Sequence, residues 1–179
     1  MKPTLKPGLR QSFSYTVPEN KTVPYTYPES PIIAQMPKVF ATGFMIVLME
    51  WTCTQLMAPH LDEGEGSLGT HVDVSHLAAT PPGFTVRVDV EVLDVQGRKV
   101  VFRVSAHDGM DLIGEGRHER VVVAWDRFNA RVADKAKSAA ELVWHGRNLT
   151  PQLHHQFRAA ASGGPWRAAA GAGARWGDC

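Results

Sequence analysis

The sequence predicts an α+β fold in which one apolar helix packs against an antiparallel β-sheet. Two observations support this prediction. Residues 42–58 form an apolar run that is longer than a usual strand and is rich in Leu and Met, which favours a helix. From residue 67 onward, apolar and polar residues alternate between turn signals, which is typical of consecutive strands.

Strands and helices are expected in a simple order along the chain. They lie at 11–17 (strand), 42–58 (helix), 70–79, 84–92, 98–107 and 112–125 (strands), and 126–137 (a short amphipathic helix). The strand over 84–92 is the clearest, because valines alternate there with charged and polar residues. Gly83, Gly97 and Gly109 mark the turns between the strands.

The helix over 42–58 carries apolar side chains all round, so we expect it to be buried on nearly every side. Thr42 is placed to act as its N-cap. Pro59 ends the helix shortly after Met57.

Five prolines interrupt the segment between Thr16 and Val39. Proline fixes φ and lacks an N–H group, so an irregular ordered loop is expected here. A loop of about twenty residues inside a compact domain is usually a lid or a binding segment. Tyr25, Tyr27 and Ile32 favour a packed lid, and a meandering edge segment is the alternative.

The composition separates the chain into two parts and excludes several classes of protein. Residues 1–136 are expected to form one domain, whereas 137–179 are rich in Ala and Gly and are expected to be a mostly disordered tail. Lys and Arg total 19 against 18 Asp and Glu, a net charge of +1, so no basic excess is available for nucleic acid.

A membrane location and a disulfide framework are not expected either. The most apolar stretch is interrupted by Glu50 and is far shorter than the roughly 20 residues that span a bilayer. Cys53 and Cys179 form neither a disulfide framework nor a metal-binding motif. No apolar leader is present at the N-terminus, so the cytoplasm is the expected compartment.

Glu50 and His76 are the first candidate functional residues. Glu50 is the only charged residue in the apolar helix, so its carboxyl must find a donor, be protonated or line a cavity. The alternative is a carboxylate that reaches solvent at the edge of the helix. Alternation puts His76 on the face shared with Val72 and Val74, where it is either a satisfied core residue or an imidazole oriented by an acid such as Glu50.

Thr42 is the third candidate, because backbone N–H groups at a helix N-terminus can hold an anion or a carbonyl oxygen. Capping alone explains a threonine at this position equally well. Along one regular helix, Thr42 and Glu50 are separated by a rise of about 12 Å, so they cannot touch. Either the helix begins later than residue 42, or a second chain completes the group.

Gly69 and Arg120 are candidate binding residues. Gly69 lies in a run of small residues at the start of a strand, where a ligand or a backbone can approach closely; a β-bulge is the alternative. Arg120 lies on the last strand, and its side chain suits phosphate or carboxylate groups, although an isolated charged edge is the commoner meaning.

Across about residues 5–136 the chain resembles the fluoroacetyl-coenzyme A thioesterases, which have the hot-dog fold, an antiparallel sheet wrapped around a central buried helix. Taken together, the motifs that carry the resemblance are specific. They are YPESP (27–31), VFATGFM (39–45), LMEW (48–51), GEGSLGT (64–70), His76 with ATPPG (79–83), SAHDG (105–109) and HER (118–120).

The resemblance implies an enzyme that hydrolyses fluoroacetyl-coenzyme A to fluoroacetate and free coenzyme A, which protects the host from a poisonous acyl-CoA. It implies a homodimer whose two sheets join, with the thioester bound near the interface. The family's catalytic residues are present in this chain as Thr42, Glu50 and His76. The family's residues that contact the substrate or coenzyme A are present as Gly69 and Arg120.

In the implied mechanism His76 is the base, Thr42 and helix-terminal amides hold the carbonyl, and Glu50 attacks the thioester or activates water. Whether Thr42 or Glu50 is the nucleophile stays open. Coenzyme A is part of the substrate, and no metal or other cofactor is expected, since these positions offer no ligand cluster.

The chain departs from the family in the lid, where Ile33 and Met36 stand in place of phenylalanines. Those aromatic residues are associated with a dry pocket that favours fluorine over the hydrogens of acetyl, so weaker discrimination against acetyl-CoA is expected here. Two alternatives remain at this point: a general short-chain acyl-CoA thioesterase, and a hot-dog protein that binds acyl-CoA without turnover.

Overall fold

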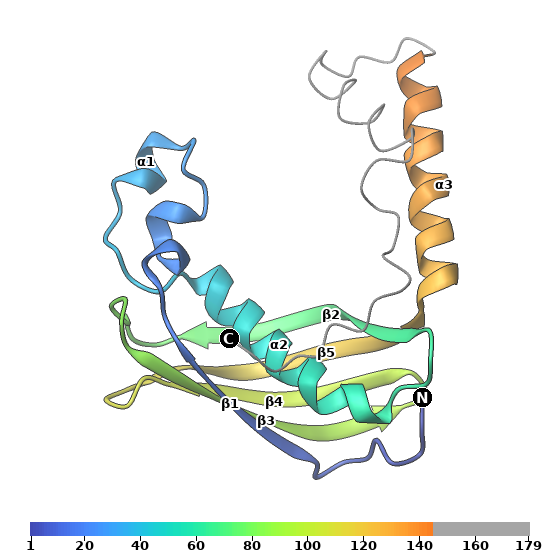
Figure 1. The fold of residues 1–179 in the computed structure, drawn as a ribbon, viewed down its shortest axis with the longest axis horizontal. Helices are drawn as coiled ribbons and strands as arrows, with labels where there is room; N and C mark the ends of the chain where they lie inside the picture. Colours follow the sequence, from blue (N-terminus) through green and yellow to red (C-terminus); the bar gives the residue numbers. More distant parts are fainter. Residues whose placement is uncertain (145–179) are drawn as a thin grey trace. The chain divides into compact units, whose positions relative to one another are not determined.

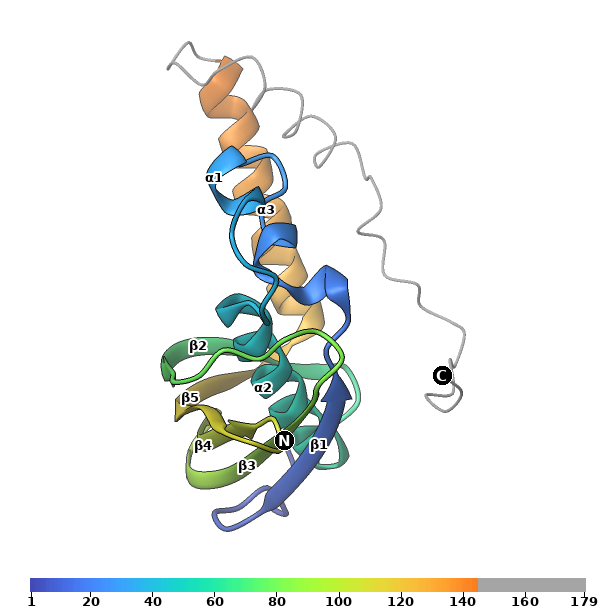
Figure 2. The same ribbon diagram turned by 90° about the vertical axis from the view of Figure 1, so that its left-hand side faces the viewer.

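A five-stranded antiparallel sheet with a long helix across one face forms the body of the protein (Figures 1 and 2). The computed structural model describes residues 1–144. The sheet has the order β1-β3-β4-β5-β2. Its strands are β1 (Arg10–Thr16), β2 (Glu65–His76), β3 (Thr85–Gln96), β4 (Lys99–His107) and β5 (Leu112–Ala124), and the helices are α1 (Pro31–Ala34), α2 (Thr42–Met57) and α3 (Trp125–Trp144).

The predicted strands all form, and two of them differ from their predicted limits by more than one residue. β2 begins at Glu65, because this residue and the four after it pair with β5, and it ends at His76, earlier than predicted. β3 continues to Gln96, beyond the predicted end at Val92. A register shift between Val92 and Asp94 breaks the alternation there, so the pattern hides the last part of the strand.

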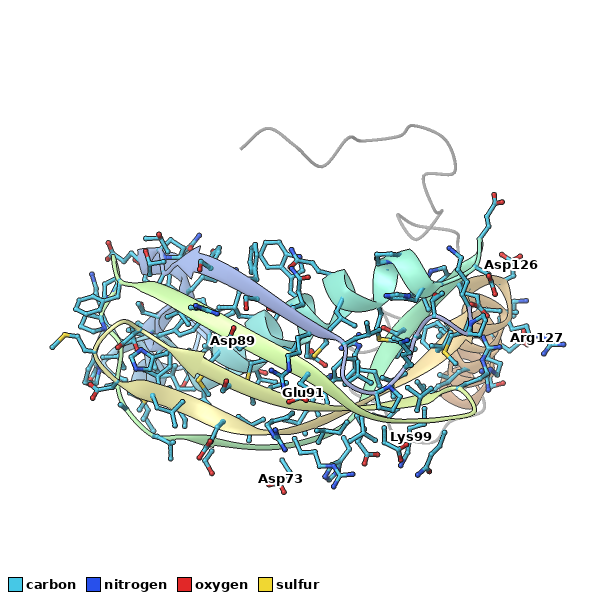
Figure 3. The ribbon with its side chains drawn as sticks, turned by 90° about the horizontal axis from the view of Figure 1, so that it is seen from below. Asp73, Asp89, Glu91, Lys99, Asp126 and Arg127 are labelled. Carbon is cyan, nitrogen blue, oxygen red and sulfur yellow. The ribbon has the colours of Figure 1, made fainter. Side chains whose placement is uncertain are left out.

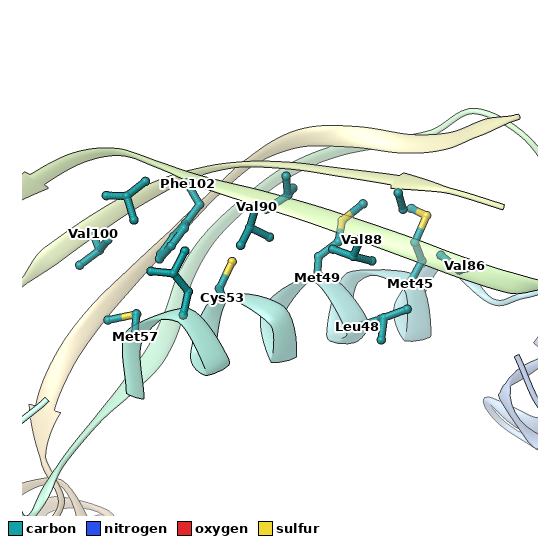
Figure 4. Close-up of a cluster of buried hydrophobic side chains, with 14 of the residues drawn as sticks. Met45, Leu48, Met49, Cys53, Met57, Val86, Val88, Val90, Val100 and Phe102 are labelled. Atoms are coloured by element: carbon teal, nitrogen blue, oxygen red, sulfur yellow. The ribbon is translucent and has the colours of Figure 1, made fainter. Parts of the chain in front are cut away.

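One side of α2 packs on the sheet and supplies the core (Figure 4). Met45, Met49, Cys53 and Met57 recur every four residues on this side and are fully buried. They face side chains that alternate inward from β3 and β4, namely Val86, Val88, Val90, Val100 and Phe102. The core therefore holds α2 at a fixed angle and rotation over the sheet.

The prediction that α2 is buried on nearly every side is wrong for the single chain. Val47 is 55% exposed and Trp51 is 41% exposed. Trp51 contacts the rings of Phe13 and Tyr15 on β1, at centroid distances of 4.6 and 6.2 Å, and this side of the helix remains partly exposed. The sheet of one chain covers only one face of a helix, so an apolar helix of this kind needs a second covering surface.

The other face of the sheet is polar. Asp73, Asp89 and Glu91 lie on it, by alternation with the inward-facing valines, and Figure 3 labels them. Arg10 and Arg103 both pair with Glu91, at 3.1 Å each. The sheet thus has one face that builds the core and one that meets solvent.

The proline-rich segment forms a lid of short turns above the N-terminal end of α2 (Figure 1). It contains the 3-10 turns Glu19–Lys21 and Val23–Tyr25 and the four-residue helix α1, with Pro31 in its first turn. An isolated bridge between Thr22 and Phe40 closes the base of the segment. The predicted irregular, proline-punctuated loop is confirmed, with short helical turns in place of extended chain.

The chain divides into two compact units, Met1–Trp125 and Asp126–Cys179. The described part of the second unit is α3, which continues to Trp144 rather than ending at residue 137. The predicted tail therefore begins with helix, because residues 137–144 are rich in good helix formers such as Ala, Glu and Leu. The remaining predicted tail, 145–179, lies outside the described residues. Within residues 1–144, no helix is both long and apolar enough to cross a membrane.

Candidate active site

Thr42 and His76 meet where α2 begins and β2 ends. The Oγ1 atom of Thr42 lies 2.8 Å from Nδ1 of His76. Thr42 is the first residue of the helix and not its N-cap, a position that Ala41 occupies without a side-chain hydrogen bond. The predicted capping role is wrong, and the hydroxyl is used for the imidazole instead.

The surroundings of this pair suit an acyl carbonyl group. The first helical hydrogen bond runs from the Met45 amide to the Ala41 carbonyl at 2.9 Å, so the amides of Thr42, Gly43 and Phe44 precede it. Such amides carry partial positive charge and can hold a developing oxyanion. Nε2 of His76 is buried and has no hydrogen-bond partner among the described residues.

Glu50 forms a second group two turns further along α2. Its Oε1 atom lies 3.3 Å from Nη1 of Arg120 and 3.4 Å from Nε2 of His118. Of the possibilities offered for this carboxyl, the structure shows a donor, Arg120, while the side chain stays 30% exposed. The contact between an imidazole and Glu50 also exists, but the imidazole belongs to His118 on β5, not to His76.

Gly69 leaves the space that the Glu50 carboxylate occupies. A Cβ atom on this residue would lie 2.3 Å from Oε1 of Glu50 and 3.1 Å from Cε1 of His118. The pairing of β2 with β5 shifts between Gly69 and His71, so a β-bulge is present as well. The bulge interpretation is therefore confirmed, whereas the group that closely approaches Gly69 is the Glu50 side chain and not the expected ligand or backbone.

Arg120 is buried, and its N–H groups donate hydrogen bonds to other groups of the protein. Nε donates to Oγ of Ser67 at 3.0 Å, and Nη2 donates to the Ser67 carbonyl at 2.9 Å. Nη1 faces both Glu50 and His118. This arrangement fixes Arg120 behind Glu50; the substrate contact implied for it stays a prediction.

Burial perturbs the ionisable groups around Glu50. It lowers the pKa of His118 below its ordinary value, with Arg120 adding to this effect and the hydrogen bond to the His71 carbonyl opposing it. It also lowers the pKa of Arg120, against the attraction of Glu50. Burial raises the pKa of the Cys53 thiol to about 12, so this cysteine stays protonated.

The two groups are separate within one chain. Because α2 is regular from Thr42 through Glu50, they lie about 12 Å apart along its axis. A later start of the helix, one of the two explanations offered by the spacing, is therefore wrong. The explanation that a second chain completes the group stays a prediction.

The lid residues Ile33 and Met36 lie in and just after α1. Ile33 is partly buried and Met36 is 46% exposed. Below the lid, an apolar hollow of about 160 Å³ opens beside the N-terminal half of α2. Its lining residues are Tyr15, Lys21, Phe40, Phe44, Val47, Leu48 and Trp51.

His118 is the residue that the sequence reasoning missed. Its two-residue spacing from Arg120 places both side chains on one face of β5, and this signal could have found it. No group of three or more His, Cys, Asp or Glu side chains gathers as a metal site within the described part of the chain.

The lowered pKa of His118 predicts a loss of stability in weak acid. The unfolded chain takes up this proton near the ordinary value of 6.5, before the folded chain does. The contribution is complete above that pH and is lost as pH falls through the folded-state value. In urea unfolding from pH 7 to pH 5, the free energy of unfolding should fall less steeply for His118→Gln than for wild type; parallel curves would contradict the assignment.

Comparison with known proteins places this geometry in a family. The family model for fluoroacetyl-CoA-specific thioesterases matches residues 18–126. A fluoroacetyl-CoA thioesterase from Streptantibioticus cattleyicolor is 55% identical over 135 residues, which cover 75% of this chain and 97% of that protein.

Solved structures agree. A mutant of the fluoroacetyl-CoA thioesterase FlK in complex with fluoroacetate has a TM-score of 0.72 at 54% identity, covering 73% of this chain and 98% of its own. A thioesterase superfamily member from Thermus thermophilus has a TM-score of 0.67 at 31% identity, covering 77% and 99%. A hot-dog-like protein from Thermanaerovibrio acidaminovorans has a TM-score of 0.62 at 26% identity, covering 72% and 91%. The chain has the hot-dog fold and belongs to the fluoroacetyl-CoA-specific thioesterase family.

Proposed function

We propose that this protein is a thioester hydrolase that converts fluoroacetyl-CoA and water to fluoroacetate and free coenzyme A. The observation that carries the proposal is the Thr42–His76 pair, with an oxygen-to-nitrogen distance of 2.8 Å, at the amide-rich start of α2. The matching family and the 55% identical thioesterase support the same reaction and the same acyl group. Removal of fluoroacetyl-CoA protects the host, and the proposed compartment is the cytoplasm.

The chemistry follows from the polarity of the thioester. The amides at the start of α2 and the Thr42 hydroxyl hold the carbonyl oxygen as it gains negative charge. In one route the Glu50 carboxylate activates a water molecule that attacks the carbonyl carbon. In the other, Glu50 or Thr42 attacks this carbon, and water then hydrolyses the resulting acyl-enzyme to release fluoroacetate. When the C–S bond breaks, His76 transfers a proton taken from the attacking water or hydroxyl group to the coenzyme A sulfur.

The site is proposed to be shared between two copies of the chain. One chain keeps the Thr42–His76 pair and Glu50 about 12 Å apart. Val47 and Trp51 on α2 are partly exposed, and β2 is an edge strand of the sheet with Val72 41% exposed. A homodimer joined at β2 covers this edge and brings Glu50 of the partner subunit to the Thr42–His76 pair.

The first test measures release of the free thiol from fluoroacetyl-CoA, acetyl-CoA and propionyl-CoA. Wild type should turn over fluoroacetyl-CoA fastest, and His76→Ala should lower kcat at least about 100-fold because the proton transfer is lost. Similar rates on all three substrates would favour a general short-chain thioesterase. Binding of acyl-CoA without thiol release would leave the non-catalytic alternative.

A mixing experiment tests the shared site. His76→Ala and Glu50→Gln are each expected to be nearly inactive. If each site takes His76 from one chain and Glu50 from the other, a mixed dimer contains one intact site out of two. Random exchange of subunits makes half of the dimers mixed. About a quarter of wild-type turnover should therefore return.

The matched control mixes His76→Ala with Thr42→Ala. Both changes then fall on the same group of one chain, so no activity should return. If the first mixture also stays inactive after subunit exchange has been verified by mass spectrometry, the three residues do not combine across the interface.

The lid residues predict modest selectivity. Ile33 and Met36 keep the lid apolar but are less rigid than aromatic rings. The double variant Ile33→Phe/Met36→Phe should raise the ratio of kcat/KM for fluoroacetyl-CoA over acetyl-CoA by about tenfold, the size of effect expected for a small shape change in an apolar pocket. Ile32→Phe is the control, since Ile32 is 81% exposed; an unchanged ratio in the double variant would remove the lid from the selectivity argument.

A further inference from the structure

His118 lies directly behind Glu50, and the mechanism above does not use it. The imidazole is 2% exposed and comes from β5, two residues before Arg120. Its Nδ1 atom lies 2.9 Å from the His71 carbonyl oxygen on β2. Its Nε2 atom lies 3.1 Å from Nη1 of Arg120 and 3.4 Å from Oε1 of Glu50.

The partners decide which nitrogen carries the proton. A carbonyl oxygen only accepts, so Nδ1 of His118 must donate to His71. In the neutral ring Nε2 then has a free lone pair. A guanidinium group only donates, so the 3.1 Å contact is a hydrogen bond from Arg120 to His118. Two acceptors cannot bond each other, and the link from neutral His118 to Glu50 therefore runs through Arg120.

The charged groups around the ring have opposing effects on its protonation. Arg120 disfavours the imidazolium, and Glu50 and Glu119 favour it, while the buried Cys53 thiol stays neutral. Burial outweighs the two carboxylates and lowers the pKa of His118. The neutral form that the geometry requires is thus also the form that the surroundings favour near pH 7.

We propose that His118 is a positioning residue, whose neutral ring accepts a hydrogen bond from Arg120 and so aims this guanidinium at the Glu50 carboxylate. The proposal rests on the role proposed above for Glu50. The bulge at Gly69–His71 supplies the carbonyl that sets the tautomer, and Gly69 leaves the room that the carboxylate needs. The backbone of β2 therefore influences the position of Glu50 indirectly, through the His118 and Arg120 side chains of β5.

Protonation of His118 would break this arrangement. A proton on Nε2 would meet the N–H of Arg120 and would instead point toward Oε1 of Glu50. The carboxylate would then be held by the imidazolium rather than the guanidinium. We expect an acid-sensitive loss of kcat that comes from the support of Glu50 and not from substrate binding.

Two near-matched variants separate the two ring nitrogens. His118→Gln retains an acceptor close to the place of Nε2 but loses the donor at Nδ1, and His118→Asn retains the donor but leaves nothing at Nε2. If the acceptor for Arg120 matters, Gln keeps kcat within a few-fold of wild type, whereas Asn lowers it about 100-fold with little change in KM. If His118 only anchors the His71 carbonyl through Nδ1, Asn is at least as active as Gln, and the proposal is overturned.

The pH profile gives a second readout that packing alone would not move. Because Gln does not titrate, the ratio of kcat for His118→Gln to that of wild type should rise as pH falls from 7 to 5. Comparing the two enzymes at each pH cancels the pH-dependent effects of groups that they share. A flat ratio would contradict the proposal. Thermal unfolding of each variant confirms that it is folded at the pH of the assay.

A measurement on the resting protein distinguishes this proposal from the proposed function. In nitrogen-15 NMR of the full chain, His118 should be the Nδ1–H tautomer at pH 7. Its pKa should rise in Arg120→Met and fall in Glu50→Gln, since these remove a cation and an anion. An Nε2–H tautomer, or a pKa that neither variant changes, would overturn the positioning role. Absence of thiol release from every acyl-CoA would instead refute the proposed function.

Discussion

A carboxylate in the middle of an apolar helix constrains this protein more than any other single feature. Glu50 interrupts the side chains that build the core, so its charge must be balanced from the sheet below. Arg120 provides this balance from β5, with His118 beside it, while Gly69 on β2 leaves the space. Each of these features would be a defect in a sheet that only had to pack against α2.

The straightness of α2 has a consequence for the assembly. One helix carries Thr42 at its first turn and Glu50 two turns later, so a single chain keeps the two groups proposed for catalysis about 12 Å apart. The same helix leaves Val47 and Trp51 partly exposed. A second chain packed on this side of α2 would bury the exposed apolar side chains and could also complete the proposed site. The need to bury apolar surface and the need to complete the site thus favour the same dimer.

The sequence predicted the elements well and the contacts unevenly. Alternation in β3 and the length of the apolar run identified the sheet and α2, because burial on one face leaves a periodic signal. The limits of β2 and β3 were missed where bulges break that period. For Thr42, capping and a functional role both stayed open, since sequence shows a hydroxyl near a helix start but not the imidazole beside it. Glu50 was expected to find a partner, but pairing of β2 with β5 decides that His118 supplies the ring, and such long-range register has no local signature.

The proposed catalytic residues and the lid residues lie on different elements, so this chain can keep the family's motifs although its lid residues differ. The groups proposed for bond breaking sit on α2, β2 and β5, which are held by the core and by ladder hydrogen bonds. Ile33 and Met36 sit on a short proline-bounded turn whose base is closed by one isolated bridge. Substitutions in the lid are therefore expected to alter its shape without moving Thr42, His76 or Glu50. In the proposed mechanism, catalysis and discrimination between acyl groups depend on different elements, so they could vary independently.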